Sequence, residues 1–309
     1  MAREDEPATF DGLGTSLLER GVTLNHRVAN YKHIFAGTMR ERQGTVRERR
    51  VIVKLAKKTA TTPWSHESYV DTYGYSFHED NDPFKHHLSP EEEGALLRRL
   101  GPHPHIGTFL ALFHVDPDAT SALVLARAGD GDMLEELELH GPIDGPASIE
   151  YIGQICSGLD YIHARSIVHL DIKPDNLALE AKEHVRIKHV RIIDFGLSAS
   201  LRRPDAKTKR PFTGSLAYSA DEVILEEEFG VEADIWSLAA TWQAMLTSYM
   251  PQRWGFDYPD PTLVGYLARK YRPRAAEIKE DLAKMALGMP NCGEAAIGAE
   301  SVEHCAQGN

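Results

Sequence analysis

HLDIKPDN, at residues 169–176, is the most informative stretch of this sequence, and DFG follows it at residues 194–196. Before the first stretch, apolar residues keep helical spacing up to His163, and the residues just before DFG are the strand-like Arg191, Ile192 and Ile193. We therefore place both stretches in loops, the first after a helix and the second after a strand.

The chain on either side of these loops has two textures. The amino-terminal half is strand-like at residues 31–38, 51–53, 108–115 and 122–126, with a charged turn expected over residues 40–50. One helix interrupts it, because Ser89, Pro90 and Glu92 form a capping box with proline at the first helical position. After a turn at residues 129–131 the pattern becomes helical. This order predicts an α+β fold of two lobes, a small antiparallel sheet with one helix and a larger, mainly helical lobe, with a cleft at their joint.

The domain boundaries follow from the same patterns. We expect a loosely held polar extension over residues 1–20, an amino-terminal lobe over residues 21–128 and a carboxy-terminal lobe over residues 129–309. An aromatic- and histidine-rich excursion, about residues 57–88, interrupts the first lobe. Its histidine spacing matches no metal template, so surface histidines and packed aromatics are the preferred interpretation, with a docking surface or metal site as the alternative.

Composition limits the partners and the compartment. The 309 residues carry a net charge of −12, which disfavours binding to nucleic-acid phosphates. Three cysteines without CxxC spacing favour a reducing compartment, and neither a signal sequence nor an apolar membrane span is found. We expect an intracellular, cytoplasmic monomer with no membrane or nucleic-acid partner; a nuclear location is the alternative.

HLDIKPDN and DFG resemble two signatures of the protein kinases, the catalytic loop and the metal-binding tripeptide. Three further matches occur in that family's order, and the resemblance covers about residues 22–290: VIVK at residues 51–54, GSLAYSADE at residues 214–222 and DIWSL at residues 234–238. The resemblance implies a bilobal kinase fold and ATP-dependent phosphorylation. Lys173 and Ser215 are similar to the serine/threonine-specific kinases, which implies Ser and Thr hydroxyls of proteins as acceptors.

The resemblance also implies a role for each catalytic position. Lys54 would hold the α- and β-phosphates of ATP, oriented by Glu93, while Asp171 would accept or orient the proton of the substrate hydroxyl. Lys173 would reach the transferred phosphoryl group. Asp194 would ligate Mg²⁺, with Mn²⁺ as an alternative, and Asn176 would ligate a second ion.

Nucleotide contacts are implied along two further stretches. Leu125 aligns with the gatekeeper beside the adenine, Ala126 to Ala128 with the backbone groups of the hinge, and Asp132 with a ribose contact. The glycine-rich loop aligns with residues 27–32, where none of the three glycines is present; Ala29 takes one of these positions and Tyr31 the aromatic tip.

Other departures bear on regulation and competence. Leu170 replaces the catalytic-loop arginine that pairs with an activating phosphate in many kinases, so we predict that Thr208→Ala and Thr213→Ala retain activity. Glu222 lacks the arginine expected after Pro290, and Glu92 is a second candidate for the partner of Lys54. An active serine/threonine kinase is the leading hypothesis. The alternatives are a nucleotide-binding pseudokinase or scaffold and, less favoured, a small-molecule kinase.

Overall fold

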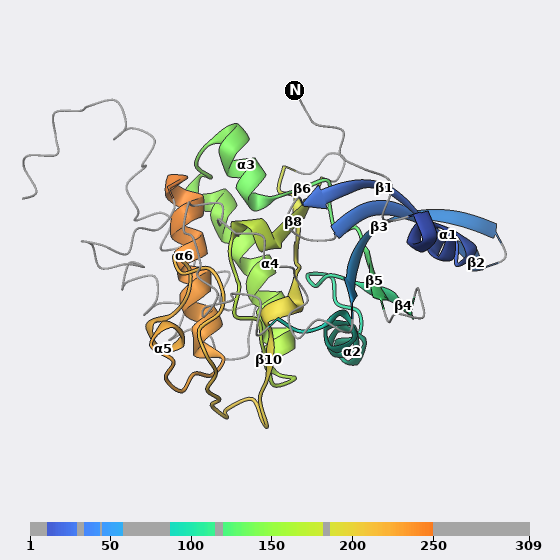
Figure 1. Cartoon of the computed structure of the whole chain (residues 1–309). Coiled ribbons are helices and arrows are strands. Elements are labelled where there is room, and N and C mark those ends of the chain that lie inside the picture. The colour runs from blue at the N-terminus through green and yellow to red at the C-terminus, as the bar shows by residue number, and fades with distance from the viewer. Residues whose placement is uncertain are drawn as a thin grey trace, which may run out of the picture.

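The computed structural model describes residues 11–29, 34–43, 45–57, 87–114, 120–181 and 186–249. These residues form two lobes that lie side by side in Figure 1. The amino-terminal lobe holds helix α1 (Asp11–Glu19), strands β1 to β5 and helix α2 (Pro90–Leu100). Residues 58–86, which make up most of the excursion, and Tyr31 lie outside the described residues, as does the chain from residue 250 onward.

The sheet of the first lobe has the strand order β1-β2-β3-β5-β4 and is antiparallel throughout. Its strands are β1 (Val22–Ala29), β2 (Ile34–Gln43), β3 (Thr45–Lys57), β4 (Phe109–His114) and β5 (Thr120–Ala126). The predicted charged turn over residues 40–50 is wrong. Strands β2 and β3 stay paired to Gln43 and Thr45, because the backbone hydrogen bonds between antiparallel strands do not require apolar side chains.

The expectation of a loose tail over residues 1–20 is also wrong where that tail is described, and the lobe has a second helix. Leu17 of α1 is completely buried in the apolar cluster that also contains Val22, Val51 and Val124. The next residue, Leu18, is 60% exposed. One leucine of the pair therefore seats α1 on the sheet, a burial that polar flanking residues concealed from sequence analysis.

Helix α2 begins as predicted. The Ser89 hydroxyl accepts a hydrogen bond from the Glu92 amide at 3.2 Å, and the Glu92 carboxylate accepts one from the Ser89 amide at 2.8 Å. Both bonds satisfy orphan donors of the first turn. The helix lies close against β5, because a Cβ on Gly94 would come within 3.2 Å of the Leu123 side chain. This packing points Glu93, which is 3% exposed, towards the sheet and away from solvent.

The carboxy-terminal lobe is built around two helices, α4 (Gly145–His163) and α6 (Glu232–Thr247). They share one apolar core, where the Trp242 indole donates to the Ser148 hydroxyl at 2.9 Å. Short elements complete the lobe: β6 (Gly131–Asp132), α3 (Met133–His140), β7 (Ile167–Val168), β8 (Leu177–Glu180), β9 (His189–Ile192), β10 (Ala199–Ser200) and α5 (Asp221–Ile224).

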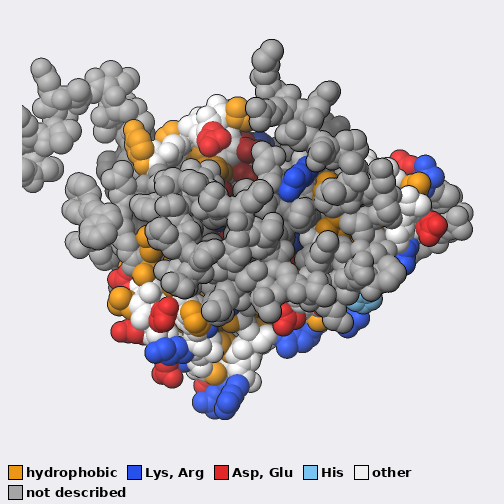
Figure 2. All heavy atoms as spheres, in the orientation of Figure 1, with side chains coloured by type: hydrophobic (Ala, Val, Ile, Leu, Met, Phe, Trp, Pro, Cys, Tyr) orange, Lys and Arg blue, Asp and Glu red, His pale blue; other side chains and the backbone are white. Residues whose placement is uncertain are grey.

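The charge on the surface and the apolar character of the helices bear on which partners the protein can have. Acidic and basic side chains are interspersed along the lower edge of the described surface in Figure 2. Among the described helices, none combines the length and the apolar character that crossing a bilayer requires. The joint between the lobes is the chain from β5 to β6, and it carries the predicted hinge.

Candidate active site

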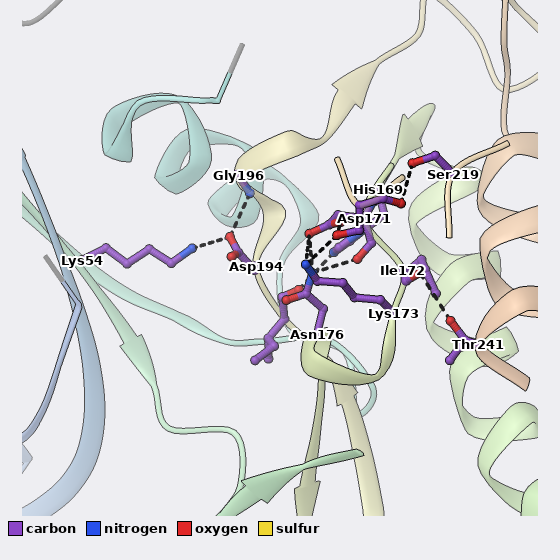
Figure 3. Close-up of polar contacts among 12 residues, drawn as sticks. Lys54, His169, Asp171, Ile172, Lys173, Asn176, Asp194, Gly196, Ser219 and Thr241 are labelled. Atoms are coloured by element: carbon purple, nitrogen blue, oxygen red, sulfur yellow. Dashed lines mark hydrogen bonds and ion pairs between the residues drawn. The ribbon is translucent and has the colours of Figure 1, made fainter. Parts of the chain in front are cut away.

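Three charged side chains meet between the lobes. The Lys54 ammonium on β3 lies 2.7 Å from the Glu93 carboxylate and 2.7 Å from the Asp194 carboxylate (Figure 3 shows the second pair). Burial alone would lower the pKa of Lys54, but the carboxylates of Asp194 and Glu93 raise it above its usual range. The lysine is therefore a fixed cation at the joint.

The predicted ion pair of Lys54 and Glu93 is confirmed. Strand β3 supplies the lysine and the fourth residue of α2 supplies the glutamate, so the pair sits near the start of the helix, as expected. Glu92 is not the partner, because its carboxylate closes the capping box.

The loop after β7 places a second charged group facing the first. Asp171 accepts a hydrogen bond at 2.9 Å from the Ser215 hydroxyl, and the Asn176 amide nitrogen donates to the Asp171 carboxylate at 2.7 Å. The Lys173 ammonium donates to Ser215 at 2.7 Å and lies 3.4 Å from Asp171. The predicted tie between Ser215, Asp171 and Lys173 is confirmed.

Electrostatics keep this group charged. Burial and the like charge of Asp194 would raise the pKa of Asp171. The Lys173 ammonium, His169 and the Ser215 hydroxyl nevertheless hold that pKa below its usual range. Burial would lower the pKa of Lys173, but Asp171, Asp175 and Asp194 raise it. Asp171 is thus an ionised hydrogen-bond acceptor at neutral pH.

Asp234 of α6 anchors the loop that carries Asp171 through hydrogen bonds to its backbone, a role that sequence analysis missed. It is completely buried and accepts hydrogen bonds from the amides of His169 and Leu170, each at 2.8 Å, and lies 2.7 Å from His163 Nε2. Burial would raise the pKa of Asp234, but His163 and His169 together hold it below its usual range. The signal was a carboxylate within an apolar helical stretch, which is costly to bury without partners.

Asp194 sits in a strained backbone position. Its φ is 61°, in the left-handed region, and its carboxylate accepts from the Gly196 amide at 3.3 Å (Figure 3). The next side chain, Phe195, is 1% exposed and packs edge-on against the His169 ring. Strain of this kind persists where the surroundings enforce it, and here the buried phenylalanine directs Asp194 towards Lys54.

The donor set fits a hard divalent ion. Asp194 provides a carboxylate that is 21% exposed, and Asn176 offers an amide oxygen while its nitrogen is engaged by Asp171. Within the described ranges no cluster of three or more His, Cys, Asp or Glu side chains forms a cage for a metal. Mg²⁺ commonly uses one or two carboxylates and takes its other ligands from phosphates and water, so these two residues suit it.

The predicted gatekeeper and hinge residues lie at the end of β5 and directly after it. Leu125 and Ala126 end the strand, the Ala126 amide donates to the Thr108 carbonyl at 2.9 Å, and Ala128 is 8% exposed. Asp132 caps α3 by accepting from the Glu135 amide at 2.9 Å. Burial, with the neighbouring Glu135 and Asp175, raises the pKa of Asp132 to about 6 against the opposing backbone hydrogen bonds.

Arg191 is a hinge contact that sequence analysis missed. Its guanidinium donates to the Ala128 carbonyl at 2.6 Å and to the Glu180 carboxylate at 2.9 Å. Arg191 lies opposite Ala178 on the paired strands β9 and β8, which directs it beneath the hinge. The sequence did not indicate this contact, because Arg191 and Ala128 are far apart in the chain and meet only in the folded protein.

The remaining predicted positions are placed less fully. Ala29 ends β1 opposite Ile34, and Tyr31 lies outside the described residues. Leu170 is buried at 4% exposure among apolar side chains. For Glu222, none of the ion pairs between described residues supplies the basic partner that the motif leads one to expect.

Comparison with known proteins gives one family. The family model described as the protein kinase domain matches residues 78–256. The chain is 31% identical over 157 residues to a probable serine/threonine-protein kinase, MARK-A, of Dictyostelium discoideum, covering 50% of this chain and 14% of that protein. It is 29% identical over 161 residues to mouse death-associated protein kinase 2, covering 52% and 42% respectively.

A third relative is the calcium/calmodulin-dependent protein kinase cmkA of Emericella nidulans, 31% identical over 162 residues, with 52% of this chain and 38% of that protein covered. The matched region thus spans less than half the length of each of these three relatives. The match includes α2, the loop at residues 169–176 and α6, and it begins after Lys54.

Proposed function

This chain belongs to the protein kinase family, and from that premise we propose that it is a serine/threonine kinase that transfers the γ-phosphate of ATP to hydroxyls of protein substrates. One observation carries the proposal. Two groups of charged and polar side chains lie at the joint, and within each group the ion pairs and hydrogen bonds are formed. The first group is Lys54, Glu93 and Asp194, and the second is Asp171, Lys173 and Asn176.

Asp171 acts on the acceptor hydroxyl. Its ionised carboxylate is already oriented by hydrogen bonds from Asn176 and Ser215, so it can accept the proton of a serine or threonine hydroxyl without reorganising. Because the transition state of phosphoryl transfer is mostly charge on phosphate oxygens, positioning this hydroxyl is the main contribution of the carboxylate.

Lys173 and Lys54 provide the positive charge. Lys173 stands beside Asp171 and is oriented towards the reacting group by Ser215, while Lys54 is held by Glu93 where the α- and β-phosphates would lie. Fixed cations in a partly buried site stabilise developing negative charge without the cost of ordering solvent. Both lysines stay protonated across the physiological pH range because neighbouring carboxylates raise their pKa values.

Asp194 and Asn176 would hold Mg²⁺, with Mn²⁺ as the alternative. When bound, the ion would partly neutralise the negative charge of the phosphates. Asp194 already contacts Lys54, so the same carboxylate can align the lysine and the ion relative to one another. Ala126 and Ala128 would hold the adenine through backbone groups and Asp132 would contact the ribose.

Partners and location remain predictions. We propose protein substrates, a monomer and an intracellular site of action, without a membrane or nucleic-acid partner. The net charge of −12 supports the absence of a nucleic-acid partner, and the free thiol of Cys156, buried in the carboxy-terminal lobe, supports the intracellular site.

The test compares the purified chain with Asp171→Asn, using Mg²⁺, γ-labelled ATP, and histone or myelin basic protein as acceptor. We expect label on Ser or Thr by phosphoamino-acid analysis and a loss of at least about 100-fold in the variant. Asp205→Asn is the matched control, since that carboxylate is exposed and pairs with Arg203 on the surface.

Two other results would replace the proposal. Stabilisation by Mg²⁺ and ATP without transfer to any protein would indicate a pseudokinase or scaffold. Transfer to a metabolite but to neither protein would indicate a small-molecule kinase.

A further inference from the structure

The residue before Asp171 lies in an apolar environment. Leu170 is 4% exposed and belongs to a cluster of apolar side chains from β7, the activation segment (residues 194–222), α5, the chain that follows it and α6: Val168, Leu201, Ala220, Val223, Phe229 and Ala233. Many protein kinases have an arginine at this position that pairs with a phosphate on the activation segment. A phosphate dianion would be costly to bury against this cluster.

A cation reaches the same region from the activation segment itself. The Arg210 guanidinium donates through Nη2 to the carbonyl of Leu197, the residue directly after DFG. Arg210 is half-buried, and within the described part of the chain its Nε is buried without a hydrogen-bond partner. The contact therefore joins the late part of the segment to its beginning.

The charge of Arg210 is poorly compensated. Burial lowers its pKa to about 10, and the carboxylate of Asp234 opposes that shift only at a distance, since its own hydrogen bonds go to His163, His169 and Leu170. Placing a guanidinium this way costs folding free energy. A role in positioning explains the contact better than a role in stability.

The end of the segment lies directly on the catalytic loop. Gly214 has φ 120°, and a Cβ there would come within 3.1 Å of the Leu170 carbonyl. Ser215 then bonds Asp171 and Lys173. Since Arg210 lies only a few residues before Gly214, fixing Arg210 to Leu197 restricts where Ser215 can lie.

We propose that Arg210 is a positioning residue that ties the activation segment to Leu197 and so holds Ser215 on Asp171 without phosphorylation of the segment. The inference rests on the proposed kinase function for its effect on activity, but the tie itself is a property of the fold. Thr213 agrees with it: its side chain is 2% exposed and its hydroxyl is buried, so a second kinase would not reach it in this arrangement.

The experiment uses the full chain, dephosphorylated with phosphatase and checked by intact mass, and three variants. Arg210→Met keeps the apolar stem and removes the donor, Arg210→Lys keeps the charge, and Arg202→Met is the control because Arg202 is an exposed arginine of the same segment. Hydrogen–deuterium exchange of residues 197–218 reports the tie directly. Steady-state kinetics with myelin basic protein report its effect on transfer.

We expect faster exchange over residues 197–218 in Arg210→Met, and a fall in kcat of about 10-fold with the KM for ATP within 2-fold of the parent. Arg210→Lys should recover part of both effects, and Arg202→Met should change neither. If Arg210 had a purely structural role, Arg210→Met would change the melting temperature and the KM for ATP together, and Arg210→Lys would recover neither.

The inference is overturned by unchanged exchange in Arg210→Met, or by dephosphorylation abolishing transfer in the parent while ATP still binds. If the parent transfers no phosphate in any phosphorylation state, the proposed function fails. The exchange measurement still decides the tie in that case, since it needs no activity.

Discussion

At the scale of single residues, the site depends on pairs whose members are distant in sequence. Lys54 and Asp194 are separated by 140 positions and meet at 2.7 Å. Their residue types are recognisable from motifs, but the electrostatic consequence, a lysine pKa raised against burial, arises only when both carboxylates surround it.

Arg191 gives a prediction at this scale. Arg191→Met removes the donor to the Ala128 carbonyl, so the hinge loses a charge-assisted hydrogen bond that orients it. We expect the KM for ATP to rise about 5- to 10-fold with kcat within 2-fold. Arg186→Met is the control, because Arg186 pairs with Asp144 away from the hinge. Equal KM values in both variants would rule out a hinge role.

Asp132 gives a pH dependence. Its pKa is raised to about 6, so the folded protein binds a proton there that the unfolded chain releases at lower pH. Stability therefore falls as pH rises from about 4 to about 6 through this group. Asp132→Asn keeps a helix cap and should remove that part of the dependence, so its melting temperature relative to the parent should be higher at pH 7 than at pH 4. A constant difference would contradict the assignment.

At the scale of elements, local signals and burial contributed differently. The capping box of α2 is a local pattern and was predictable from Ser89, Pro90 and Glu92. Helix α1 was not, since its burial depends on Leu17 meeting strands that follow it in the chain. Propensity and flanking polarity cannot report which side of a short helix will be covered.

The start of α2 can be tested by mutation. Ser89→Ala removes the cap and should lower the free energy of unfolding by about 1 kcal/mol. Arg98→Ala, on the exposed side of the same helix, should change it by less than about 0.5 kcal/mol. Urea denaturation of both variants gives the comparison. Equal losses would mean that the cap does not stabilise the helix.

Two adjacent leucines test the seating of α1. Leu17→Ala should lower the free energy of unfolding by about 2 to 5 kcal/mol, because Leu17 is completely buried. Leu18→Ala should have little effect, because that side chain is 60% exposed. Denaturant titration separates the two. If both variants lost only a little free energy of unfolding, α1 would have to be interpreted as a loosely held tail.

At the scale of the whole molecule, both lobes contribute to one site. Strand β3 and α2 supply Lys54 and Glu93, the other lobe supplies Asp171, Asn176 and Asp194, and Ser215 of the activation segment donates to Asp171. Figure 3 shows Lys54 pointing towards Asp194. An arrangement already closed in this way should not require a covalent modification to form.

Thr208 and Thr213 test that expectation. Thr208→Ala and Thr213→Ala should each retain at least half of the parent's transfer rate, since Leu170 cannot pair with a phosphate. For Thr213→Ala, removal of a buried hydroxyl that lacks a partner in the described structure should also leave the melting temperature unchanged or raised. Collapse of activity in either variant would show that phosphorylation is needed.

The sequence by itself determined the family resemblance, the two-lobe order and the residue types at Lys54, Glu93, Asp171, Lys173, Asn176 and Asp194, because short motifs and local periodicity encode these. Only the tertiary structure decided the burial of Leu17, the buried anchor at Asp234 and the contacts of Arg191 and Arg210. Each joins segments far apart in the chain or depends on which side of an element is covered. Such contacts form only once packing excludes water, so no local pattern in the sequence predicts them.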